Sequence, residues 1–145
     1  MDFISAISFP SLSVNEGAAR AVVAAFSAQA DPSITELQDI KCVVSEAVTN
    51  SIVHAYPDLV GEIYISVRIF EGRLIRIEIK DKGKGIEDIA MARTPLYTTS
   101  PESERSGMGF TVMESFTDKM TVRSKPGKGT AVVLFKQLAD KKNAE

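Results

Sequence analysis

Two neighbouring segments alternate strictly between apolar and polar residues, and this pattern constrains the fold more than any other feature. The segments are GEIYISVRIF and RLIRIEIKD, and only Glu71 and Gly72 separate them. Alternation at period two indicates strands, and a short connection containing glycine is typical of a β-hairpin. We therefore expect one apolar face, made by Ile63, Ile65, Val67, Ile69, Ile75, Ile77 and Ile79.

A long, mostly apolar segment before the hairpin predicts a helix. We expect Asp31 to be its N-cap and Pro32 its first residue, because an acidic cap and a proline at the first position are common helix starts. The helix should run through KCVVSEAVTNSIVHAY and stop before Pro57. This segment supplies the apolar surface that can cover one face of the hairpin.

An earlier helix is predicted from Ser13 to about Gln29. Ser13 followed by Glu16 has the spacing of a capping box. Helical periodicity indicates one face of small residues that can lie close to a sheet. The residues of this expected face are Val14, Ala18, Val22, Ala25 and Gln29.

The remaining segments complete a fold of class α+β. Residues 2–9 have the apolar content of a strand, a short helical stretch should end at Arg93, GFTVMESF can begin a helix, and KMTVRS with TAVVLF predicts a hairpin around PGKG. Strands and helices thus segregate into a two-layer α/β sandwich, with a mostly antiparallel sheet and helices on one face. We expect one domain over 1–137 and a disordered tail over 138–145.

Composition excludes several classes of function. A formal net charge of −2 gives no general attraction to nucleic acid or anionic membrane. The single cysteine, Cys42, cannot form an internal disulfide, which fits a reducing compartment. The sequence contains no apolar run of membrane-spanning length and no basic N-terminus typical of a signal peptide. We expect a cytoplasmic protein. We also expect the second face of the sheet to be a subunit interface.

Three polar residues share one face of the long helix. Glu46, Asn50 and His54 are spaced by four residues, so a helix stacks them. A carboxylate next to a carboxamide offers a general base and an oxygen ligand for Mg²⁺, which suits phosphoryl transfer. The motif by itself is more often a solvated polar stripe on an amphipathic helix. A histidine such as His54 is more often placed near a helix C-terminus because the helix dipole favours it there than because it is a ligand.

Glycine-bearing segments follow a strand and precede a helix. In DKGKGI, Asp81 can accept a hydrogen bond from an exocyclic amine such as that of adenine, although such a segment alone is more often a simple turn. In RSGMGF, backbone N–H groups before a helix can face phosphate, and Arg105 adds a planar set of donors, or is a surface loop residue. GKGT lacks the pattern of a Walker A motif and indicates a hairpin turn.

Taken together, these segments carry a family resemblance. SEAVTNSIVHAY, DKGKGI, RSGMGF and GKGT resemble the N, G1, G2 and G3 boxes of the GHKL ATPase and kinase superfamily, whose members share a Bergerat-type α/β sandwich. PLYTTSPESERSGMGFTVMESF is similar to the anti-sigma F factor family of endospore-forming bacteria, and the likeness covers nearly the whole chain. The resemblance implies a homodimeric serine kinase that binds ATP or ADP with Mg²⁺. It also implies two partners, sporulation sigma factor F, which is held inactive, and an anti-anti-sigma factor, which is phosphorylated on a serine.

The resemblance also implies roles for individual residues. Glu46 is implied as the general base, Asn50 as the Mg²⁺ ligand and Asp81 as the adenine partner. Arg105 is implied to reach the γ-phosphate, and Arg20 to contact a partner protein. Further nucleotide contacts are implied for Gly83, Gly85, Thr99, Ser106, Gly107, Met108, Gly109 and Thr130. The segment from Thr94 to Glu104 corresponds to the family's lid.

The sequence departs from the family pattern at two places. Lys82 and Lys84 stand where many relatives have an acidic and an apolar residue, and Ser100 and Ser103 stand where lysine and leucine are common. Alternative functions are an anti-sigma B type serine kinase and a nucleotide-gated protein that sequesters a sigma factor with little catalysis. The ATPase half of a sensor histidine kinase fits less well, since His54 is the only histidine.

Overall fold

The core of the protein is a sheet of five strands in the order β1-β2-β3-β5-β4. The computed structural model describes residues 2–93 and 109–140. The strands are β1 (Phe3–Pro10), β2 (Glu62–Phe70), β3 (Leu74–Asp81), β4 (Lys119–Lys125) and β5 (Gly129–Gln137). Each of the four pairings is antiparallel, which confirms the expected α+β class and both predicted hairpins.

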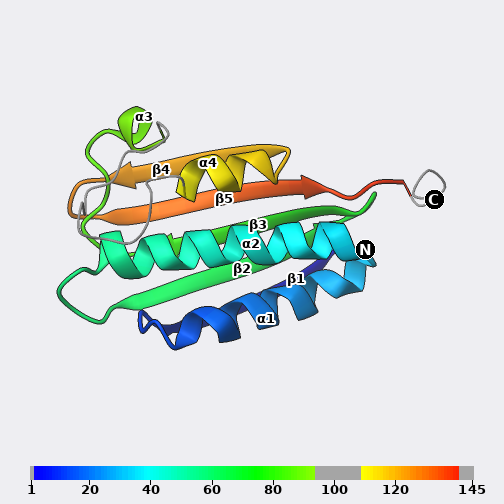
Figure 1. The fold of residues 1–145 in the computed structure, drawn as a ribbon, viewed down its shortest axis with the longest axis horizontal. Helices are drawn as coiled ribbons and strands as arrows, with labels where there is room; N and C mark the ends of the chain where they lie inside the picture. The colour runs from blue at the N-terminus through cyan, green and yellow to red at the C-terminus, as the bar shows by residue number, and fades with distance from the viewer. Residues whose placement is uncertain (1, 94–108, 141–145) are drawn as a thin grey trace.

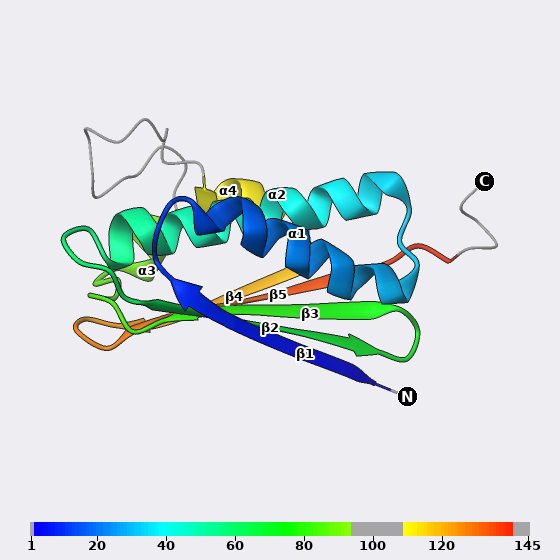
Figure 2. The same ribbon diagram turned by 90° about the horizontal axis from the view of Figure 1, so that it is seen from below.

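The helices cover one face of this sheet. They are α1 (Asn15–Ser27), the 3₁₀ turn η1 (Ala28–Ala30), α2 (Ile34–Asn50), the π-helical turn η2 (Ser51–Ala55), α3 (Ile89–Ala92) and α4 (Gly109–Ser115). Figure 2 shows α1, α2 and α4 on the same side of the strands, and α1 packs beside α2. Within the described part of the chain, no helix has the length and apolar character needed to cross a membrane.

The alternating hairpin builds the floor of the core as predicted. Val67 lies opposite Ile77, and both are at most 2% exposed. All seven residues of the expected apolar face are buried. Val44 and Val48 of α2 are fully buried in the same cluster, so the central helix lies directly over the central strands. Apolar side chains of this size each contribute about 1.5–3 kcal/mol when buried.

The buried face of α1 differs from the predicted one. Ala19, Val23 and Ser27 are buried, whereas Ala18 and Ala25 are exposed and Val14 is 77% exposed. The true face is therefore rotated by one residue. Alanines occur all around this helix, so the spacing of small residues could not select the side that meets α2 and the sheet.

Both predicted helix starts are wrong. The helix α1 begins after Val14 without a side-chain cap, and the carboxylate of Glu16 instead accepts hydrogen bonds from Arg20 and Ser45. The helix α2 is capped by Ser33, whose Oγ accepts from the N–H of Glu36 at 3.1 Å while Glu36 Oε1 accepts from the N–H of Ser33 at 2.9 Å. Asp31 instead has a left-handed backbone with φ of 56° and ends η1. The reversal of the chain at Asp31 moves the helix start to Ser33.

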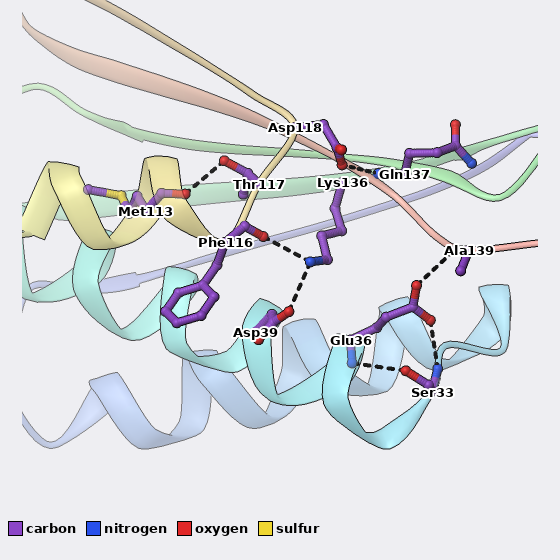
Figure 3. Close-up of polar contacts among 10 residues, drawn as sticks. All are labelled: Ser33, Glu36, Asp39, Met113, Phe116, Thr117, Asp118, Lys136, Gln137 and Ala139. Carbon is purple, nitrogen blue, oxygen red and sulfur yellow. Dashed lines mark hydrogen bonds and ion pairs between the residues drawn. The ribbon is translucent and has the colours of Figure 1, made fainter. Parts of the chain in front are cut away.

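A polar network joins the layers at the end of the sheet where β5 terminates (Figure 3). Lys136 Nζ donates to Asp39 Oδ2 of α2 at 3.0 Å and to the carbonyl of Phe116 at 2.9 Å. The N–H of Ala139 donates to Glu36 Oε2 at 2.8 Å. Leu138 is only 3% exposed, so the packed chain continues beyond the expected boundary at 137. Residues 141–145 of the expected tail lie outside the described residues.

The capping geometry separates two serines that look equivalent in sequence. Ser33→Ala should lower the free energy of unfolding by about 1 kcal/mol, because the helix α2 loses its cap. Ser13→Ala should change it by less than about 0.5 kcal/mol, because Ser13 is exposed and its side chain caps no helix. Urea unfolding followed by circular dichroism measures both values, and equal losses would contradict the assignment of the cap.

Candidate functional site

A cleft of about 630 Å³ opens between the helical layer and one end of the sheet. Figure 1 places η2 at the end of α2, the end of β3, the β4–β5 turn and α3 at this same end. The volume lies within the range of small-molecule sites. The lining includes Asn50, Ser51, His54, Asp81, Lys84, Gly85, Gly109, Phe110 and Thr130.

Asp81 is the central polar group of the cleft and is 5% exposed. Its Oδ1 accepts from the N–H of Gly83 at 3.0 Å and from the N–H of Thr130 at 3.2 Å, and its Oδ2 accepts from Ser51 Oγ at 3.1 Å. Burial raises the pKa of Asp81 above its ordinary value, although these three hydrogen bonds oppose the rise. The carboxylate therefore joins three segments and keeps acceptor capacity on Oδ2 for a ligand.

The turn after Asp81 requires glycine at two positions. A Cβ at Gly83 would lie 2.4 Å from the carbonyl oxygen of Ala55, so the turn packs directly on η2. Gly85 has φ of +76°, and a Cβ there would lie 2.1 Å from the carbonyl oxygen of Lys125. The backbone of the DKGKG segment is thus held between η2 and the β4–β5 turn. This close packing is one reason why glycine occupies both positions of the turn.

The three stacked polar residues do not all reach the cleft. Asn50 and His54 line it, whereas Glu46 is half-buried and is not among the lining residues. Burial lowers the pKa of His54 below its ordinary value, and the nearby Lys84 cation lowers it further. A neutral imidazole at pH 7 therefore faces the cleft beside the Asn50 carboxamide.

Thr130 lies beside Asp81 because these two residues pair across β3 and β5. Its Oγ1 shares a hydrogen bond with Ser124 Oγ at 2.8 Å. Ser124 Oγ also accepts from the N–H of Ile86 at 2.8 Å, so it connects β4 with the turn beyond Gly85. The predicted adenine partners Asp81 and Thr130 are therefore neighbours in the fold, although 49 positions separate them in sequence.

The remaining predicted site residues fall into three groups. Thr99, Arg105 and the phosphate-loop residues Ser106, Gly107 and Met108 lie outside the described residues, as do Ser100 and Ser103. Gly109 and Phe110 begin α4 and line the cleft. Arg20 is outside the cleft lining, on α1, where its guanidinium bonds Glu16 Oε1 at 3.2 Å.

The two unusual lysines point in different directions. The ammonium of Lys82 lies 5.3 Å from the centre of the Tyr64 ring, on the sheet face away from the helices. Lys84 lines the cleft, and its backbone is fixed by Lys84 N–H to Ala55 O at 3.1 Å and by Gly127 N–H to Lys84 O at 2.6 Å. Only one of the two departures therefore places a cation in the cleft.

Sequence reasoning missed three residues that hold the site together. Ser51 and Ser124 bond the predicted site residues directly, and Tyr56 Oη accepts from the N–H of Lys82 at 2.6 Å. Ser51 and Tyr56 lie within SEAVTNSIVHAY, but a four-residue helical count does not select them. The π-helical turn changes which side chains face the cleft, and no local sequence pattern predicted this turn.

One side chain in the described part of the cleft carries a group that a divalent cation accepts as a ligand. The described residues contain no group of three or more His, Cys, Asp or Glu side chains arranged to hold a metal ion. Asn50 does present a carboxamide to the cleft, and an amide oxygen is a ligand that Mg²⁺ accepts. Such a donor set fits an ion that enters with a ligand's phosphates and retains much of its water.

Comparisons with known sequences find relatives over most of this chain. The family described as "Histidine kinase-like ATPase domain" matches residues 9–136. The curated anti-sigma F factor of Anoxybacillus flavithermus is 55% identical over 137 residues, covering 94% of this chain and 93% of the relative. That of Bacillus subtilis is 50% identical over 137 residues, with the same coverage of 94% and 93%.

Solved structures show the same fold at low sequence identity. The RsbU and RsbW domains of a Mycobacterium tuberculosis protein superpose with a TM-score of 0.70 at 17% identity, over 95% of this chain and 33% of that one. The histidine kinase domain of a blue-light activated kinase from Erythrobacter litoralis gives a TM-score of 0.56 at 20% identity, over 85% and 61% of the two chains. This chain thus spans about a third of the first structure.

The buried carboxyl group predicts a pH effect on stability. Because the pKa of Asp81 is raised on folding, the folded state holds its proton at pH values where the unfolded state has lost it. The free energy of unfolding should fall as pH rises from the ordinary pKa through the raised one. Asp81→Asn should remove this fall, because an amide does not titrate in this range. The Asn side chain can still accept from Gly83 and make a hydrogen bond with Ser51.

Urea unfolding between pH 3 and pH 8 measures the effect, and the variant should gain stability relative to the wild type towards neutral pH. Asp58→Asn is the control, since Asp58 is exposed. Parallel pH curves for the wild type and Asp81→Asn would contradict the raised pKa.

Proposed function

Because this chain belongs to the family of histidine kinase-like ATPase domains that includes the anti-sigma F factors, we propose that it is an ATP-dependent anti-sigma factor and protein serine kinase. Its proposed partners are sporulation sigma factor F, which it inhibits, and an anti-anti-sigma factor, which it phosphorylates on a serine. The observation that carries this proposal is the cleft in which Asp81, Asn50 and the glycine turn converge.

The cleft supports a specific placement of ATP or ADP. The Oδ2 of Asp81 accepts a hydrogen bond from the exocyclic amine of adenine. Thr130 and the turn through Gly83 and Gly85 support the base. Gly109 is proposed to lie towards the phosphates, since it begins α4 and lines the same cleft. Asn50 would hold Mg²⁺ together with the phosphates, and the ion would supply charge neutralisation of the triphosphate.

The residues of α2 supply the proton chemistry in this proposal. Glu46 accepts the proton of the substrate serine as the serine oxygen attacks the γ-phosphorus of ATP, and ADP leaves. Glu46 lies one helical turn before Asn50 and outside the nucleotide cleft. This placement suits a group that contacts the incoming protein rather than the nucleotide. Arg105 is proposed to stabilise the charge on the transferred group.

The other face of the sheet supports a homodimer. Tyr64, Val133 and Phe135 lie on that face, and the Lys119 ammonium lies 6.0 Å from the centre of the Phe135 ring. Val133 is already buried, but no helix of the described residues covers this face, so it suits association with a second copy. Arg20 on α1 is proposed as a contact for a protein partner.

A second candidate is a nucleotide-gated protein that sequesters a sigma factor with little catalysis. A third candidate with the same site is an anti-sigma B type kinase, which differs in its partner.

Two substitutions on α2 separate catalysis from binding. Glu46→Gln should lower the rate of phosphate transfer to the acceptor protein by about 10²–10⁴-fold, because the proton acceptor is lost. It should leave ATP affinity unchanged. Asn50→Ala should remove Mg²⁺-dependent ATP binding, and with it both phosphate transfer and inhibition of the sigma factor. Transfer of ³²P from ATP and titration calorimetry measure the two properties.

Equal phosphate transfer by the wild type and Glu46→Gln would exclude Glu46 as the base, and would leave the ATP site standing. Absence of heat on titrating the wild type with ATP or ADP at millimolar Mg²⁺ would overturn the nucleotide site itself. For the partners, affinity capture from native cytosol with ATP or ADP should recover a sigma factor and a small acceptor protein. Recovery of neither would contradict the proposed partners.

A further inference from the structure

The hydroxyl of Tyr56 lies between two strands beside the nucleotide cleft. Tyr56 follows η2 and is 7% exposed. Its Oη donates to the carbonyl of Glu62 at 2.8 Å and accepts from the N–H of Lys82 at 2.6 Å. Both partners are backbone groups, one at the start of β2 and one directly after the end of β3.

This hydroxyl stands where the next backbone contact of the hairpin would form. The β2–β3 ladder ends at the pair Ile63 and Asp81, so the following pair would be Glu62 and Lys82. The phenol instead bridges these two residues and satisfies both backbone groups. The strand β3 can therefore separate from β2 immediately after Asp81 while the Lys82 N–H and the Glu62 C=O keep a hydrogen-bond partner.

The π-helical turn holds the same segment at two more points. The N–H of Tyr56 donates to Ser51 O at 3.1 Å, which closes the wide turn. Ser51 Oγ donates to Asp81 Oδ2, and Ala55 O accepts from Lys84. Ser51, Ala55 and Tyr56 thus fix three of the four residues from Asp81 to Lys84. π-Helical turns are frequent at functional sites, and here the turn supplies the spacing of these three contacts.

The position of the hydroxyl is itself constrained. The Tyr56 ring packs against Gly61 so closely that a Cβ there would lie 2.2 Å from the ring. Burial raises the pKa of the Tyr56 phenol above its ordinary value, so the hydroxyl keeps its proton and can donate to Glu62. The oxygen therefore cannot move without displacing the loop before β2.

We propose that the Tyr56 hydroxyl is a positioning group of the nucleotide site, which sets the place of the Asp81 carboxylate by holding the backbone of Lys82. The inference rests on the proposed binding of ATP. Tyr56 is outside the cleft lining, but it keeps Oδ2 of Asp81 aligned with the adenine amine. Tyr56 acts through Asp81 and touches no nucleotide atom.

Tyr56→Phe tests this directly, because it removes one oxygen and keeps the ring. The dissociation constant for ATP should rise about five- to tenfold, as expected for one lost hydrogen bond, whereas the rate at saturating ATP should stay within about twofold. Inosine triphosphate lacks the amine, so the ratio of its dissociation constant to that of ATP should fall in this variant. Thr117→Val is the matched control, because it also removes one hydroxyl that donates to a backbone carbonyl, that of Met113 at 2.7 Å, and Thr117 is outside the cleft lining. Its ATP affinity should be that of the wild type.

Gly61→Ala provides a second route, because its Cβ would push the Tyr56 ring aside while leaving the hydroxyl in the protein. It should narrow the same nucleotide preference. If Tyr56→Phe lowers the melting temperature but leaves the ATP affinity and the preference for ATP over inosine triphosphate unchanged, Tyr56 has a structural role only. That result would overturn the inference while leaving ATP binding by the wild type intact. A wild type that binds no ATP would overturn the proposed function and this inference together.

Discussion

The site depends on one buried carboxylate that three separate segments share. Asp81 is the last residue of β3, and it accepts hydrogen bonds from β5, from the turn that follows it and from η2 at the end of α2. A buried carboxylate is costly unless such bonds satisfy it. The three segments must therefore be in place together, and each is placed by a different part of the fold.

The central core supplies the rigidity that this arrangement needs. The helix α2 lies over the fully buried face of the β2–β3 hairpin, so its end cannot shift relative to the end of β3 without disturbing packed isoleucines and valines. At the opposite end, Lys136 ties β5 to α2 and to the residue after α4. The cleft is thus the open end of a layer pair that is fixed along its length.

The glycine turn shows how packing and binding use the same residues. Gly83 and Gly85 allow the backbone to lie against Ala55 and Lys125, and this contact turns the chain away from the sheet beside Asp81. The same geometry leaves the carboxylate accessible from the cleft. A glycine motif that indicates ligand binding in sequence is therefore also a requirement of local packing.

The sequence by itself determined the strands, the central helix and the chemical character of the site. These features arise from local periodicity and from residue types at short spacing, so the β2–β3 hairpin, α2, and the candidates Asn50, Asp81 and Thr130 could be read from it. Glu46 was also selected, yet the structure leaves it outside the cleft lining. The family resemblance supplied roles that periodicity could not.

Only the tertiary structure decided the buried face of α1, the caps of both helices and the contacts of Ser51 and Tyr56. Alanines all around α1 gave no preferred side, and two Ser-x-x-Glu segments looked alike although only Ser33 caps a helix. Ser51 and Tyr56 act on residues about 30 positions away, through a π-helical turn. Such contacts depend on how elements pack against one another, and local sequence patterns do not predict that packing.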